Sequence, residues 1–279
     1  MRVKFVFKIL LIFIAFTLFS FCLPVINVKG IDPLLTSATF LFSVLYGFEI
    51  SIVINNFSQL KTQVATENAG LLSIFHLSQI LGGDSAKEIE EKIESYLLKA
   101  IDYPLDQHLR TDKEFFQIFR PLIKLSNAGG DQKGQALQYM NEGLYYIPQA
   151  RNQIAEVAPK FVDSSVWIML LTLTFVLLGI MILGRDQEFF SKLTVAIFST
   201  TVVGALFLLD EIDSNRVQEE HLEYGAFNQT LESMGKMPYY PDFAIQQGVV
   251  KLPKNSVYRI GHFPKYPAIE ERKIEIMGK

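Results

Sequence analysis

Four stretches of the 279-residue chain consist almost entirely of apolar residues. Each is about twenty residues long, which lets a helix cross the roughly 30 Å hydrocarbon core of a bilayer. They cover residues 6–26, 34–54, 164–183 and 189–209. Short polar connections, VKGIDP and GRDQE, join the first stretch to the second and the third to the fourth. The pattern therefore predicts two hairpins of transmembrane helices.

The first stretch follows basic residues at the N-terminus, so a cleaved signal peptide is the alternative to a transmembrane helix. The residues that end it, Phe19-Ser20-Phe21 before Cys22, lack the small residues of a cleavage site. The bulky phenylalanine before the cysteine also argues against lipoprotein processing. We therefore expect an uncleaved first transmembrane helix.

The helical pattern of the second stretch continues beyond the length of a membrane span. No proline or glycine pair interrupts the chain between residue 34 and Gly82-Gly83, a pair typical of a helix end. The sequence thus predicts one helix over residues 34–81, roughly 70 Å long at 1.5 Å per residue. Less than half of this helix lies in the bilayer, so the remainder projects into the cytosol or packs in a bundle.

The distribution of lysine and arginine predicts the orientation, because cytoplasmic segments carry an excess of these residues. Basic residues near one end of the spans are Arg2, Lys4, Lys8, Lys61, Arg151, Lys160 and Arg216, against Lys29, Arg185 and Lys192 at the other end. Both termini and the long middle segment are therefore expected in the cytoplasm.

The middle segment, residues 55–163, has helical periodicity throughout, with a final helix over about 132–157. Ser85 with Glu88, and Thr111 with Glu114, have the spacing of capping boxes and predict that two helices begin there. Residues 210–235 have the pattern of a charged helix, and short β-like pieces such as GVVKLP and SVYRIGHFP follow it.

Two helices of the middle segment have a buried seam that carries a single charge. The residues of the two seams are Val64, Glu67, Leu71, Ile74, Ser78 and Leu81 on the first, and Leu137, Met140, Leu144, Ile147, Arg151, Ile154 and Ala158 on the second. An unpaired buried charge costs several kcal/mol, whereas a paired one roughly breaks even. We therefore expect Glu67 and Arg151 to share a buried charge network. The alternative is two seam-edge charges whose side chains reach outward to water.

Composition excludes several classes of function. The formal net charge of −3 argues against a nucleic-acid partner, and the single cysteine, Cys22, excludes an internal disulfide and a multi-cysteine metal site. The four histidines lack metal-binding spacing, and the sequence has no phosphate loop or nucleophile motif. We expect neither an enzyme nor a cofactor or metal site. The acidic run Glu88, Glu90, Glu91 and Glu94 fits a solvated helix face.

One face of the second span is polar or small. Its residues are Thr36, Thr39, Ser43, Gly47 and Ser51, with Phe40 between them. Such a face either lines an aqueous path, in which Phe40 gates by excluding water, or lets two helices approach closely. Glu49, the acid of the spans, lies within about two turns of the cytoplasmic end, and a structural role fits it better than a functional one.

Several of these segments resemble the bestrophin-like domain family of bacterial and plant membrane proteins. The resemblance rests on the phenylalanine-rich run from Phe42 through Phe57 to TENAGLL, on Tyr96 with IDYPLDQ, on Arg151, Pro159 and Trp167, and on the tail PYYP…YRIG. The chain departs from the family pattern at Asn68, at Asp102-Tyr103-Pro104 and at Asp210-Glu-Ile-Asp. The likeness to true bestrophins implies a homopentameric anion channel whose second spans line a central pore that continues into a cytosolic vestibule.

The expected fold class is therefore an all-α membrane protein with four transmembrane helices, a cytoplasmic helical bundle and a small β-containing C-terminal tail. The expected divisions are spans 1 and 2 in residues 1–54, a cytoplasmic helical region in 55–163, spans 3 and 4 in 164–209, and a cytoplasmic helix and tail in 210–279. We expect a homo-oligomeric channel for small inorganic anions in a bacterial inner membrane, with Thr36, Thr39, Phe40, Ser43 and Gly47 nearest the path. The alternative is a non-conducting membrane scaffold or sensor whose cytoplasmic bundle binds a partner.

Overall fold

The computed structural model describes residues 2–26, 28, 30–121, 131–159, 161–213, 222, 224–253, 256–264 and 271–278. The chain forms two compact units. The first comprises Met1–Asn55 and Lys160–Ser214, and the second comprises Asn56–Pro159 and Asn215–Lys279. Helix α2 (Asp32–Leu81) supplies residues to both units.

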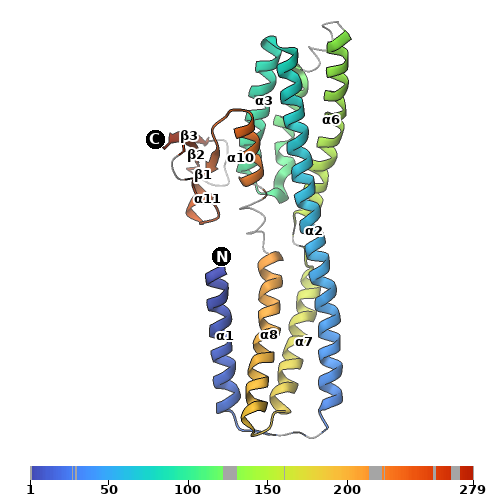
Figure 1. Ribbon diagram of the computed structural model, residues 1–279, viewed down its shortest axis with the longest axis vertical. Helices are drawn as coiled ribbons and strands as arrows, with labels where there is room; N and C mark the ends of the chain where they lie inside the picture. The colour runs from blue at the N-terminus through green and yellow to red at the C-terminus, as the bar shows by residue number, and fades with distance from the viewer. Residues whose placement is uncertain are drawn as a thin grey trace. The chain divides into compact units, whose positions relative to one another are not determined.

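The first unit consists of apolar helices that lie side by side in Figure 1: α1 (Arg2–Cys22), the first part of α2, α7 (Ser164–Leu183) and α8 (Phe189–Asp213). In the described part of the chain, α2, α7 and α8 are long and apolar enough to cross a membrane, and Val6–Cys22 of α1 is a shorter apolar helix. The structure thus supports a helical membrane unit, and α1 as a fourth span remains an expectation.

Close packing of α1 on α8 holds this unit together. A methyl group placed at Gly204 of α8 would lie 3.0 Å from Ile9 Cδ1, which shows how closely the two helices approach. Arg185, in the turn between α7 and α8, donates two hydrogen bonds from Nη2 to the carbonyl oxygens of Leu23 and Pro24, at 2.7 and 3.0 Å. These carbonyls follow the end of α1, so the arginine fastens that end to the α7–α8 turn.

Helix α2 is unbroken from Asp32 to Leu81, and it passes through Asn55 and Asn56 without a turn. This confirms the single long helix predicted over residues 34–81. The predicted stop is also present: Gly82 and Gly83 have φ angles of +64° and +78°, in the left-handed region that glycine tolerates best.

The second unit packs α3 (Gly83–Asp102), η1 (Leu105–Thr111), α4 (Asp112–Gln117) and α6 (Asp131–Val157) with the later part of α2. Helix α10 (Tyr224–Ser233) packs on α3, and α11 (Asp242–Gln246) packs on a small sheet. The sheet has the order β1 (Tyr239–Pro241), β2 (Tyr258–His262), β3 (Lys273–Met277). β1 pairs with β2 in parallel, and β2 with β3 antiparallel. The sheet, labelled in Figure 1 beside α10 and α11, confirms the β-containing tail.

The predicted helix ends have mixed outcomes. The expected start at Ser85 was wrong: α3 begins at Gly83, and no side chain caps it, because the left-handed glycines already turn the chain at this point. The expected start at Thr111 was right, since α4 follows directly at Asp112, but Thr111 does not cap this helix because its hydroxyl is bonded to the His108 carbonyl and the Arg151 side chain. Of the charged helix expected over 210–235, the structure describes the end of α8 at Asp213 and α10, and residues 214–221 and 223 lie outside the described residues.

Candidate functional site

The membrane-length part of α2 has one face turned toward the helices of the first unit and one face exposed. On the inward face, Tyr46 donates a hydrogen bond to the Ala205 carbonyl of α8 at 3.1 Å and stacks on Phe42 with 5.8 Å between ring centres. Ala38, Glu49 and Val53 are also buried on this face. The intramembrane carboxyl of Glu49 is therefore directed away from the exposed face.

The five residues expected nearest a conduction path lie on the exposed face. They are Thr36, Thr39, Phe40, Ser43 and Gly47, all exposed, with Phe40 at 66%. The Thr36 hydroxyl donates to the Asp32 carbonyl at 2.9 Å, which leaves its oxygen free to accept. The structure thus brings these residues together on one surface that the described part of the chain leaves exposed.

Glu67 and Arg151 lie in one buried hydrogen-bond network in the second unit. Glu67 comes from α2 and is fully buried, and Arg151 comes from α6 and is 1% exposed. Glu67 Oε1 lies 3.7 Å from Arg151 Nη1, and the Tyr96 hydroxyl of α3 accepts from Nη1 and donates to Oε1. The arginine also donates to Thr111 Oγ1 at 3.1 Å and to Asp112 Oδ1 at 2.5 Å.

His108 of η1 completes the network on the other oxygen of Glu67. Its Nε2 lies 2.8 Å from Glu67 Oε2, and its ring stacks on Phe227 of α10 with 5.8 Å between ring centres. Its Nδ1 is buried and has no hydrogen-bond partner among the described residues. Because a proton on Nδ1 would have no acceptor there, the geometry favours a proton on Nε2, which can be donated to Glu67 Oε2.

Two opposing effects set the charges of this network. Burial alone would raise the pKa of Glu67, but His108, Arg151 and the Tyr96 hydroxyl outweigh it, so the pKa of Glu67 is lowered. Burial and the facing Glu67 carboxylate raise the pKa of Tyr96 well above its usual value. Burial opposes the charge on Arg151, yet Tyr96, Glu67 and Asp112 together raise its pKa. The network therefore holds an ionised glutamate, a neutral tyrosine and a charged arginine.

A second cluster of charges joins the C-terminal segment to α3. Lys236 lies 2.6 Å from Glu90, Arg259 lies 2.5 Å from Glu94, and Arg272 pairs with the buried Asp102. The acidic run was expected to be solvated, and this was wrong for Glu90 and Glu94, because basic residues far away in sequence cover them. Among the described residues no group of three or more possible metal-ligating His, Cys, Asp or Glu side chains occurs.

Asp102 is the most buried acid of this second cluster. Tyr239 of β1 donates its hydroxyl proton to Asp102 Oδ1 at 2.6 Å, and Arg272 reaches Oδ2. Burial raises the pKa of Asp102 to about 6, although Arg272 and Tyr239 act to lower it. The cluster attaches the small sheet to α3.

Sequence reasoning missed His108 as a member of the buried network. Its spacing to other polar residues gives no signal, because its partner Glu67 lies on another helix. Tyr96 was noticed only through the family resemblance. The apolar stretch around α3, with Ile93 and Leu97, places Tyr96 on a buried face, and that is the signal available from sequence.

The membrane-length helices and the helical second unit define a helical integral membrane protein. The Bestrophin-like domain model matches residues 29–214, and the chain therefore belongs to the Bestrophin-like family. A crystal structure of a mutated bacterial Bestrophin homolog from Klebsiella pneumoniae superposes with a TM-score of 0.59 at 10% sequence identity, covering 83% of this chain and 100% of that one. That likeness shows a shared fold. No curated protein sequence matches this chain.

Proposed function

We propose that this protein is an oligomeric ion channel of the bestrophin type that conducts small inorganic anions. Membership of the Bestrophin-like family and the bestrophin fold support a channel of this type. In this proposal α1 is a fourth span, both termini lie in the cytoplasm of a bacterium, and several copies surround a central path. The number of copies is five by analogy with bestrophins.

The exposed face of α2 is the observation that carries the proposal. Hydroxyls that face lipid can bond only within their own helix, as Thr36 does with the Asp32 carbonyl, so a subunit alone in lipid gains nothing from exposing them. The face instead combines Thr36, Thr39 and Ser43 with Gly47, while Phe42 and Tyr46 point inward. Copies arranged around an axis would turn the hydroxyls toward water and toward permeating ions.

The chemistry of this face favours anions. The Thr39 and Ser43 hydroxyls can donate hydrogen bonds to an anion that has lost part of its water shell, whereas the Thr36 hydroxyl already donates to the Asp32 carbonyl. The acid of this region, Glu49, is buried on the opposite side of α2, so its charge does not face the path. Phe40 is the large apolar side chain between the hydroxyls and would form a constriction that closes by excluding water.

Chloride flux from liposomes that contain the purified full-length protein tests the proposal. We expect flux from the wild type and a several-fold higher flux from Phe40→Ala. The matched control is Phe175→Ala on α7, an exposed phenylalanine in another membrane-length helix, which should leave the flux unchanged. Folded protein that is silent to all ions, in both wild type and Phe40→Ala, would overturn the channel and favour the scaffold or sensor.

The assembly gives an independent check. Mass measurement of the protein in detergent should show an oligomer, because a central path between copies requires one. A monomer under conditions that preserve the fold would contradict the proposal whatever the flux.

A further inference from the structure

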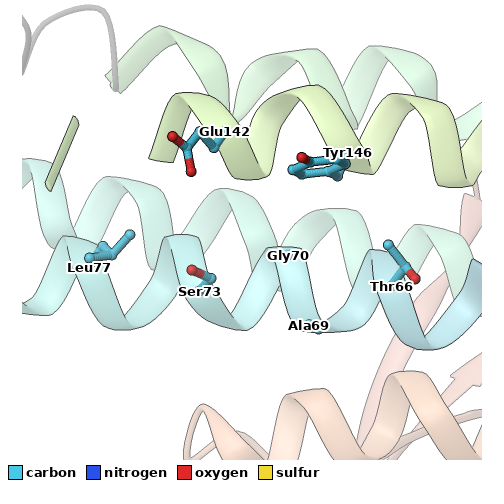
Figure 2. Close-up of a pocket in the computed structure, with 7 residues that line it drawn as sticks. All are labelled: Thr66, Ala69, Gly70, Ser73, Leu77, Glu142 and Tyr146. Carbon is cyan, nitrogen blue, oxygen red and sulfur yellow. The ribbon is translucent and has the colours of Figure 1, made fainter. Parts of the chain in front are cut away.

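A groove with a volume of about 520 Å³ runs between α2 and α6 in the second unit. Figure 2 shows it lined by Thr66, Ala69, Gly70 and Ser73 from α2 and by Glu142 and Tyr146 from α6. Small side chains on α2 leave the space open, and Tyr146 stands at its edge with 57% of its surface exposed. The spacing of three and four residues along α2 makes this a helix face suited to close contact with another side chain or helix.

A second surface, on α4 and the residues after it, has an exposed apolar side chain between cations, whereas the groove is hollow and carries an acid. Lys113, Phe116 and Arg120 are exposed and follow one another by three and four residues, so they lie on one face. Phe116 is 58% exposed, whereas its neighbour Phe115 is buried in the core of the unit. This face therefore presents one large apolar side chain between two cations.

We propose that the α2–α6 groove of one copy receives the Phe116 face of a second copy. The charges agree: Glu142 is the acid of the groove, and Lys113 and Arg120 flank the protruding phenylalanine. Two different surfaces of the same chain then meet, which is a head-to-tail contact, and a contact of this kind generates a closed ring when its rotation closes. The proposal rests on the oligomeric channel proposed above and specifies its contact outside the membrane.

The groove is better suited to a protein side chain than to a small molecule. Small-molecule sites enclose most of the ligand surface, whereas this groove is open along one side and several of its lining residues are exposed. Its lining also has a single formal charge, which complements the two cations beside Phe116.

Cysteine crosslinking in the full-length protein tests this contact. In a Cys22→Ser background, Ser73→Cys combined with Lys113→Cys should give a ladder of crosslinked species on mild oxidation, because a disulfide needs Cα atoms within about 7 Å. Each single variant should remain uncrosslinked. Ser73→Cys with Glu91→Cys, on an exposed position of α3, is the matched control and should also give no ladder.

Charge reversal gives a second readout that does not depend on disulfide geometry. Glu142→Lys should weaken assembly about tenfold, because it places like charges on the two sides of the contact, and adding Lys113→Glu should restore it. Circular dichroism establishes that each variant is folded. An oligomer that conducts anions but shows neither the ladder nor the charge rescue overturns this contact and leaves the channel standing. A folded, silent monomer overturns both.

Discussion

Glu67 Oε1 lies 3.7 Å from Arg151 Nη1 inside the second unit, and the Tyr96 hydroxyl is bonded to both groups. Neither side chain has meaningful contact with water. A buried pair of this kind adds little net stability, because the loss of hydration offsets the attraction. Its main consequence is that α2, α3 and α6 must keep one register, since a shift of any of them leaves a buried charge without a partner.

Removal of the glutamate charge should therefore destabilise the protein strongly. Glu67→Gln leaves Arg151 buried with only the partly exposed Asp112 as a carboxylate partner, and the free energy of unfolding should fall by about 3–5 kcal/mol. Urea unfolding followed by circular dichroism in detergent measures this. The matched control is Glu91→Gln, an exposed acid on α3, which should change stability by less than about 0.5 kcal/mol. Equal stabilities of the two variants would contradict a buried pair.

The course of the helices could be predicted from the sequence because each has a local pattern. Apolar stretches of membrane length identified α7 and α8, and the absence of a break up to Gly82-Gly83 identified the whole of α2. The start of α4 after Thr111 could be predicted in the same way, whereas the start of α3 could not. The capping spacing at Ser85 competes with left-handed glycines, and tertiary hydrogen bonds replace the capping hydrogen bond of Thr111.

The buried network was partly predictable, because a single charge on an apolar seam must find a partner. That argument leads to Glu67 and Arg151 but not to His108, whose role depends on how η1 packs against α2. The attachment of the tail was not predictable. Arg259 and Arg272 meet Glu94 and Asp102 only through the long-range fold, and no pattern within the tail indicates those partners.

Asp102 should make stability depend on pH in an uncommon direction. Its pKa is about 6 in the folded protein against about 3.8 in the unfolded chain, so between these values the folded state holds a proton that the unfolded state has lost. The contribution is fully present below pH 3.8 and is lost as the pH rises through about 6, by up to ~3 kcal/mol. The lowered pKa of Glu67 has the opposite effect on stability. Its contribution is present above pH 4.5, the usual pKa of a glutamate, and is lost as the pH falls below that value.

Unfolding free energies of wild type and Asp102→Asn between pH 7 and pH 5 test this. The wild type should gain stability on acidification, and the asparagine variant should lose most of that gain because it cannot take up the proton. Asp106→Asn, at an exposed position of η1, should follow the wild type. Parallel pH profiles for wild type and Asp102→Asn would refute the assignment to this carboxyl.

Gly261 in β2 should not tolerate a side chain. A methyl group there would overlap the Tyr239 hydroxyl and lie 2.7 Å from its Cζ, so the ring would be pushed away from Asp102. We expect Gly261→Ala to lower the free energy of unfolding by about 1–3 kcal/mol and to expose the tail to protease. Tyr239→Phe, which loses the hydrogen bond but keeps the ring, separates the two effects. If Gly261→Ala is cleaved no faster than Tyr239→Phe, steric overlap is not the cause.

Asp213, at the end of α8, should control the environment of Trp167. Its Oδ1 accepts from the backbone N–H groups of Phe161 and Val162 at 2.9 and 3.0 Å, and its Oδ2 accepts from Trp167 Nε1 at 3.1 Å. Asp213→Ala leaves three donors without this acceptor and should cost about 2–4 kcal/mol of unfolding free energy.

Since Trp167 is the sole tryptophan of the chain, its fluorescence reports the change directly. We expect emission at longer wavelength and easier quenching by iodide in Asp213→Ala, and little change in Asp210→Ala, whose carboxyl is exposed on the same helix. Unaltered emission in Asp213→Ala would show that the environment of the indole does not depend on this carboxyl.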